Sequence, residues 1–120
     1  MSVFQLEGFQ RFVQSLPGTS LVDQWGSRVA KVGGKVFSLF GLSEDPGCIV
    51  FKCTEDSFVV LTGIEGVKQA PHFAKRQWVS VPKVPDIPDD EIEAYLRRSY
   101  HLVSQGLTKK LRQELGIPFE

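Results

Sequence analysis

Two adjacent glycines, Gly33 and Gly34, separate two segments in which polar and apolar residues alternate. These segments, residues 28–32 and 35–39, have the pattern of β-strands with one buried face. Two glycines between such strands favour a tight hairpin, because both turn residues need positive φ angles. The sequence therefore predicts an antiparallel start to the sheet rather than strict βαβ alternation.

Helical and extended patterns surround this hairpin. Apolar residues recur at helical spacing over residues 6–16, where Ser2 and Gln5 are expected to form a capping box and Pro17-Gly18 to end the helix. Residues 19–27 are expected to be a connection. Further strands are expected at 48–53, 67–72 and 77–81, the second of them weakened by Pro71.

Two threonines mark the expected starts of later helices. Thr54 is followed by acidic residues, as is typical of an N-cap, and Thr108 is expected to cap a last short helix ending near Leu115. Between them, Pro82, Pro85 and Pro88 predict a stiff connection. A long helix with an inner apolar stripe is expected after it, with acidic residues from Asp86 to Glu93 at its start. The pattern leaves open whether 104–115 continues this helix. We expect an α+β fold of two layers, with an antiparallel five-stranded sheet, helices on one face and the order α-β3-α-β2-α(-α).

The size and net charge of the chain limit its functional class. Its 120 residues predict a single domain over 1–120, and 14 basic residues balance 14 acidic ones. A net charge of zero excludes a uniformly basic coat for nucleic acid, although a local basic patch remains compatible with it. The sequence has no apolar run of membrane-spanning length and no signal-peptide pattern, so we expect a cytoplasmic protein without membrane contact.

Catalytic and metal-binding patterns are not recognisable in the sequence. His72 and His101 are isolated, and Cys48 and Cys53 are spaced to point to opposite faces of a strand rather than to form a redox pair. The Gly33-Gly34 pair lacks the spacing of a phosphate-binding loop. We therefore expect no catalytic residue, no cofactor and no metal.

Charge is segregated along the chain. Residues 67–85 carry four basic residues and no acidic one, a net charge of +4, whereas 86–96 carry five acidic residues and no basic one. His72, Phe73 and Trp78 lie within the basic segment. Basic residues interleaved with aromatic ones are typical of nucleic-acid contacts, but the same pattern fits core aromatic residues with a solvated basic rim.

Several segments together resemble the MmcQ/YjbR family. They are residues 30–39 (AKVGGKVFSL), 49–52 (IVFK), 66–75 (GVKQAPHFAK), 77–81 (QWVSV) and 98–103 (RSYHLV). The resemblance extends over residues 3–112 and implies an α-β3-α-β2-α domain related to secretion-chaperone-like and double-wing folds. It also implies DNA binding, and it brings no catalytic signature or cofactor.

The basic pattern and the resemblance together give a set of candidate binding residues. We expect DNA phosphates and bases to be contacted by Lys31, Lys35, Lys52, Lys68, His72, Lys75, Arg76 and Trp78. The alternative is a protein-binding or chaperone-like adaptor that uses the sheet face. In either case the chain is expected to be a monomer or a weak dimer.

Overall fold

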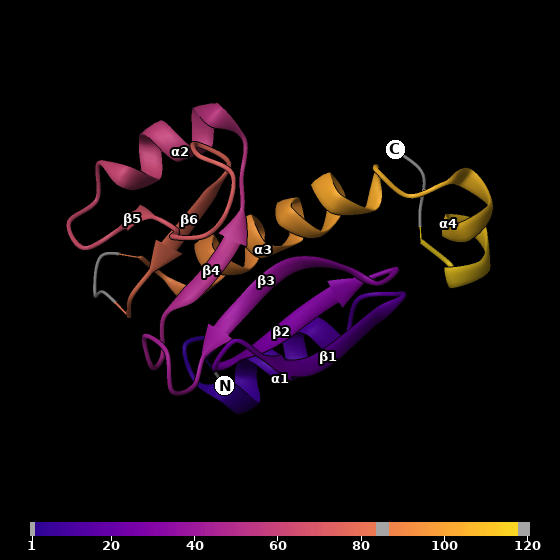
Figure 1. Cartoon of the computed structure of the whole chain (residues 1–120), viewed down its shortest axis with the longest axis horizontal. Coiled ribbons are helices and arrows are strands. Elements are labelled where there is room, and N and C mark those ends of the chain that lie inside the picture. Colours follow the sequence, from indigo (N-terminus) through magenta and orange to yellow (C-terminus); the bar gives the residue numbers. More distant parts are fainter. Residues whose placement is uncertain (1, 84–86, 118–120) are drawn as a thin grey trace.

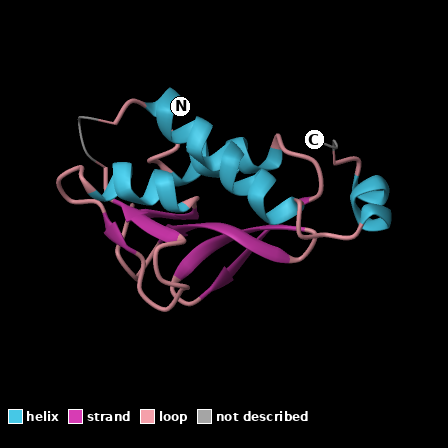
Figure 2. Ribbon diagram, turned by 90° about the horizontal axis from the view of Figure 1, so that it is seen from above, coloured by secondary structure: helices cyan, strands magenta, loops and turns pink. Residues whose placement is uncertain are grey.

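A layer of helices covers one face of an antiparallel sheet (Figures 1 and 2). The computed structural model describes residues 2–83 and 87–117, so Pro85 of the expected connection and Asp86 of the expected helix start lie outside the described residues. In chain order the elements are α1 (Leu6–Gln14), β1 (Thr19–Gln24), β2 (Ser27–Val32), β3 (Lys35–Gly41), β4 (Ile49–Lys52), α2 (Glu55–Thr62), β5 (Lys68–Gln69), β6 (Trp78–Val81), α3 (Asp89–Ser104) and α4 (Lys109–Leu115). The expected α+β architecture is confirmed.

The sheet has the strand order β1-β2-β3-β4-β6-β5, and every neighbouring pair is antiparallel. Gly33 and Gly34 have φ angles of 57° and 83°, so the hairpin turn between β2 and β3 is confirmed. β5 is shorter than expected. Pro71 follows it closely and has no N–H to donate to a neighbouring strand.

The expectation of a connection over 19–27 was wrong. Residues 19–24 form β1, an edge strand that pairs with β2 along its whole length and adds a sixth strand to the expected five. Trp25 and Gly26 form the two-residue turn, with φ angles of 55° and 71°. Tryptophan is rare at a turn position of this kind, so this turn lacks one of the two residues that usually mark a hairpin.

The main core lies between the helix layer and the sheet. Its largest fully buried side chains include Phe9 of α1, Phe37 and Phe51 of the sheet, and Leu96 and Tyr100 of α3. Phe9, Phe51 and Leu96 lie where the apolar patterns place buried residues. One face of each helix and one face of the sheet therefore share a single hydrophobic core.

Hydrogen bonds to the backbone fix α3 against the sheet. The Ser99 hydroxyl donates to the carbonyl oxygen of Lys52, and the Tyr100 hydroxyl donates to that of Pro17. Both side chains are buried, so the bonds satisfy polar atoms that would otherwise be costly to bury. The inner face of α3 is thereby held in one position against β4 and the end of the first helix.

The helix ends agree in part with the sequence. Thr54 and Thr108 accept hydrogen bonds from the N–H groups three residues further on, so both N-caps are confirmed. The region 104–115 is divided, because α3 ends at Ser104 and α4 begins at Lys109. The capping box was wrong: Gln5 is the N-cap of α1 without a side-chain bond, and the Ser2 hydroxyl instead accepts from the N–H of Phe4.

Candidate functional site

A second, smaller apolar cluster lies on the sheet face that the helices do not cover. The strand register places Val29 beside Leu39 and Leu39 beside Val50, so these side chains leave the same face. Trp78 joins them and is 8% exposed, with its ring stacked on that of Phe73 at a centroid distance of 4.4 Å. Trp78 therefore anchors the apolar cluster on this face. We call this side of the sheet the open face.

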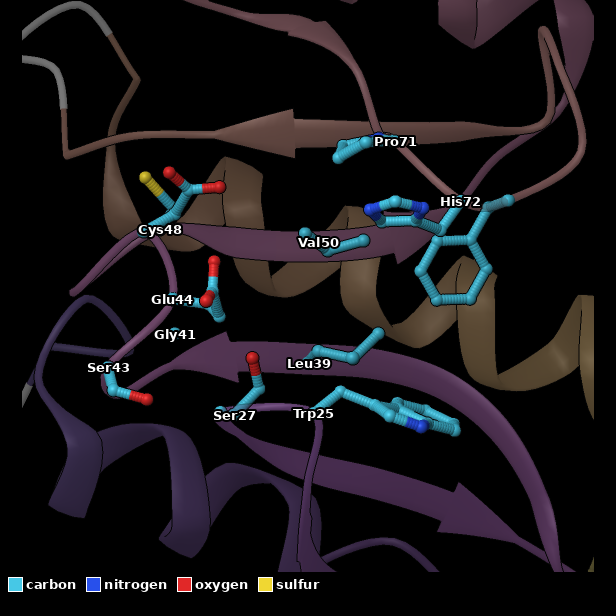
Figure 3. A pocket seen from close by; sticks show the side chains of 13 residues that line it. Trp25, Ser27, Leu39, Gly41, Ser43, Glu44, Cys48, Val50, Pro71 and His72 are labelled. Carbon is cyan, nitrogen blue, oxygen red and sulfur yellow. The ribbon is translucent and has the colours of Figure 1, made fainter.

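A pocket of about 750 Å³ opens on the open face. It is lined by the turn between β1 and β2, the loop after β3 and the segment after β5. Figure 3 shows Trp25 and His72 at one end of the pocket, on opposite sides of Leu39 and Val50. Glu44 lies toward the opposite end of the pocket. The volume falls within the range of roughly 300–1,000 Å³ that is typical of small-molecule sites.

Backbone hydrogen bonds hold two walls of the pocket together. The carbonyl oxygen of Gly26 accepts from the N–H groups of Leu42, Ser43 and Glu44, at 3.0, 3.0 and 3.2 Å. The turn also packs closely on the loop, because a Cβ atom added to Gly26 would lie only 2.7 Å from Cγ of Glu44. The β1–β2 turn and the loop after β3 therefore form one connected wall.

Charge divides the open face into two zones. The pocket lining contains the carboxylates of Glu44 and Asp45 but no lysine or arginine. Outside the lining, Lys31, Lys52 and Lys68 project from β2, β4 and β5 on the same face, as the register with Val36, Trp78 and Ser80 shows. An anion approaching this face meets favourable charge around the pocket and unfavourable charge inside it.

The structure brings together some of the predicted binding residues. Lys31, Lys52, Lys68 and Trp78 share the open face, and His72 lines the pocket, where it has a φ angle of 70°. Whether any of them contacts a ligand stays a prediction.

The remaining candidates lie elsewhere. Arg76 forms an ion pair with Glu55 of α2, with 2.8 Å between Nε and Oε1. Lys35 extends toward Gly106, between α3 and α4 on the helix side, since a Cβ atom on that glycine would be 3.8 Å from its Nζ. Lys75 is exposed in the segment before β6. Arg76 and Lys35 therefore do not form one surface with the lysines of the open face.

Sequence reasoning missed two residues that shape the pocket, Trp25 and Glu44. A usable signal was present for Trp25: it precedes a glycine between two segments that both become strands. No comparable signal marked Glu44, because its position depends on how the loop folds back onto the carbonyl oxygen of Gly26.

The two cysteines face opposite sides of the sheet, as their spacing predicts. Cys53 is buried in the main core, whereas Cys48 lines the pocket. Burial raises the pKa of the Cys48 thiol and Asp45 raises it further, against the opposing effect of Lys68. A raised pKa lowers the fraction of reactive thiolate, so the Cys48 thiol is not activated. Its rate of alkylation can instead be used to measure the accessibility of the pocket.

Burial raises the pKa of the Cys53 thiol from 9.0 to about 11, which predicts a pH effect on stability. The folded state holds this proton more tightly than the unfolded chain, so the contribution is full below pH 9 and is lost as the pH rises to about 11. We expect the stability difference between the wild type and Cys53→Ala to shrink over this interval, by at most about 3 kcal/mol. Urea unfolding of both proteins from pH 8 to 11 measures it, and a difference independent of pH would contradict the buried thiol.

The described residues contain no group of three or more His, Cys, Asp or Glu side chains placed to hold a metal ion. No helix within residues 2–83 and 87–117 is both long and apolar enough to cross a membrane.

The fold and the pocket define an α+β domain with helices on one face of an antiparallel sheet and a ligand-sized pocket on the other. The model of the YjbR family matches residues 14–102, and the chain belongs to this family. The family resemblance seen in the sequence is thus confirmed. No curated protein matches the chain significantly.

Solved structures agree with this assignment. The crystal structure of the Deinococcus radiodurans protein DR2400, with a DUF419 domain, has a TM-score of 0.84 at 25% identity, covering 95% of this chain and 89% of that one. A Pseudomonas syringae protein solved as a structural genomics target has a TM-score of 0.67 at 19% identity, covering 82% and 97%. The second similarity concerns the fold alone.

Proposed function

We propose that the protein binds DNA on the open face of its sheet and acts by binding rather than by catalysis. The observation that carries the proposal is the set of three lysines, Lys31, Lys52 and Lys68, on three strands of one face. None of the three forms an ion pair with another residue in the described part of the chain. Their ammonium groups are therefore available to phosphates, whose neutralisation supplies much of the affinity for DNA.

The distribution of acidic residues supports the same face. Four carboxylates cluster at the start of α3 in the helix layer, away from the open face, at Asp89, Asp90, Glu91 and Glu93. A polyanion would be repelled by that end of the helix layer and attracted by the open face. A protein with a net charge of zero can thus present one face to DNA, with an affinity that depends on few contacts.

Charge reversal tests the proposed face. We expect Lys52→Glu/Lys68→Glu to reduce the affinity for labelled DNA at least about tenfold at low salt, because two favourable phosphate contacts become repulsive. Fluorescence anisotropy over a salt series gives the measurement. Three phosphate contacts predict a log–log slope of about −2 for single strands in the wild type, and a shallower slope in the variant.

A matched double reversal separates surface from net charge. Lys109→Glu/Lys110→Glu changes the net charge equally on exposed residues of α4, which lies at one end of the molecule. We expect this variant to keep most of the affinity and the full salt slope. Equal losses in the two variants would contradict the open face, and no binding by the wild type at low salt would favour the protein-binding adaptor.

A further inference from the structure

Trp25 occupies its turn against both local conformation and solvation. With positive φ at Trp25 and Gly26, the two-residue turn is one in which asparagine or glycine is strongly favoured at the first position. A tryptophan there incurs backbone strain. Its side chain is nevertheless 63% exposed, so burial of the ring does not compensate for the strain. The turn instead places the exposed indole ring of Trp25 at the wall of the pocket.

The opposite wall repeats this arrangement. His72 also has a positive φ angle, 70°, and is exposed at the pocket, across Leu39 and Val50 from Trp25 (Figure 3). Two flat rings beside an apolar floor suit a flat, largely apolar ligand that can stack. Nucleobases have this shape, and one base with its sugar is compatible with a pocket of about 750 Å³.

The charges decide which part of a nucleotide enters the pocket. Glu44 and Asp45 disfavour a phosphate inside it, whereas Lys52 and Lys68 attract phosphates to the surrounding face. Carboxylates only accept hydrogen bonds, so they select a base edge that carries donors. Guanine presents two adjacent donors, N1–H and the N2 amino group, to one carboxylate. Thymine presents a single N3–H between two carbonyl oxygens, which a carboxylate would repel.

We infer that the pocket receives one unpaired base of a single DNA strand and prefers guanine. Trp25 and His72 form the walls along the base, and Glu44 accepts from its donor edge. The sugar–phosphate backbone stays outside, along the lysines of the open face. This inference rests on the DNA-binding function proposed above, and its test separates the failure of one from the failure of the other.

The test compares oligonucleotides that differ only at one central position. The probe is a fluorescein-labelled oligothymidylate of about ten nucleotides, a length bound by single-strand-binding folds, with guanine, thymine or an abasic site at its centre. Stacking of one base on aromatic side chains predicts about 5- to 100-fold tighter binding of the guanine probe than of the abasic one. The thymine probe is expected to fall between them.

Two variants assign the discrimination to the pocket. Trp25→Asn places a favoured residue in the turn, so the melting temperature is expected to stay or rise while the difference between guanine and abasic probes is lost. Glu44→Gln is expected to remove the preference for guanine over thymine and to keep the preference for a base over an abasic site. Glu65→Gln, at an exposed residue outside the pocket lining, serves as its control and is expected to change neither preference.

Tryptophan fluorescence gives a second readout at the same site. Trp25 is 63% exposed and Trp78 only 8%, so quenching by added guanosine reports on Trp25.

Salt-dependent DNA binding with equal affinities for the guanine and abasic probes would overturn the base pocket and leave the DNA-binding proposal standing. Failure of all the probes to bind at low salt would overturn both. Retention of the guanine preference in Trp25→Asn would also overturn the assignment to this pocket.

Discussion

Replacing Phe37 with alanine is expected to lower the free energy of unfolding by about 3–5 kcal/mol, the range typical of a buried phenylalanine. The side chain is 0% exposed, and its ring meets that of Tyr100 edge-on at a centroid distance of 5.7 Å. Since Tyr100 belongs to α3, the two rings join the sheet to the longest helix. The residues on either side of Phe37 are paired, Val36 with β2 and Ser38 with both β2 and β4, which limits how far the backbone can move to fill the cavity. Urea unfolding at neutral pH measures the loss.

Two further variants make this result interpretable. Phe37→Leu keeps most of the volume and is expected to cost about 1 kcal/mol, which protects the test if the alanine variant fails to fold. Val59→Ala removes an apolar side chain that is 58% exposed on α2, and it is expected to change stability by less than about 0.5 kcal/mol. Similar losses in Phe37→Ala and Val59→Ala would contradict the core described here.

The position of Phe37 also shows how far the sequence predicts this sheet. Strict alternation in residues 35–39 places Phe37 and Leu39 on one face, and the structure separates them. Ala30 pairs with Ser38 but Lys31 pairs with Val36, so Phe37 is an extra residue in a β-bulge. Phe37 consequently packs in the main core while Leu39 belongs to the cluster on the open face.

The bulge explains why the fold was more predictable than the site. Hydrophobic periodicity and turn glycines are local signals, and they predicted the antiparallel sheet, the helix layer and two threonine caps. The floor of the pocket depends on which face Leu39 takes, and this is set by the bulge. Two adjacent apolar residues, Val36 and Phe37, interrupt the alternation there, but they do not show which face the following residues take. Its walls depend on contacts between the turn at Trp25 and the loop at Glu44, which are distant along the chain.

The positions of the candidate lysines on the sheet could also be predicted from local strand patterns, but only for some of them. The alternation in β2 identifies Lys31 as a residue on the face opposite Ala30, and a strand at 48–53 does the same for Lys52. Arg76 belonged to the same basic run as Lys68, but its chain reaches Glu55 because α2 packs beside β5 and β6. Charge runs along the sequence therefore do not translate directly into charged surfaces.

Gly41→Ala is expected to displace the loop that carries Glu44 and to destabilise the fold by about 1–3 kcal/mol, the usual range for overpacking. A Cβ atom at this position would lie 2.0 Å from the carbonyl oxygen of Asp45 and 2.4 Å from that of Glu44. Both are backbone atoms, so no side-chain rotation relieves the clash. The backbone of Gly41 also donates to Cys48 and accepts from Gly47, at 2.9 and 3.0 Å, which ties the loop to the end of β3.

Displacement of this loop has a consequence beyond stability, because the loop also forms the polar end of the pocket. We expect faster alkylation of Cys48 in Gly41→Ala than in the wild type, measured below the unfolding transition, and a loss of the guanine preference. Gly63→Ala is the matched control, since a Cβ atom there has no backbone neighbour closer than 3.4 Å and the φ angle of −75° suits alanine. Unchanged Cys48 alkylation and stability in Gly41→Ala would show that the loop does not close onto β3. A change in Gly41→Ala alone would support a role for this contact in holding the loop that carries Glu44.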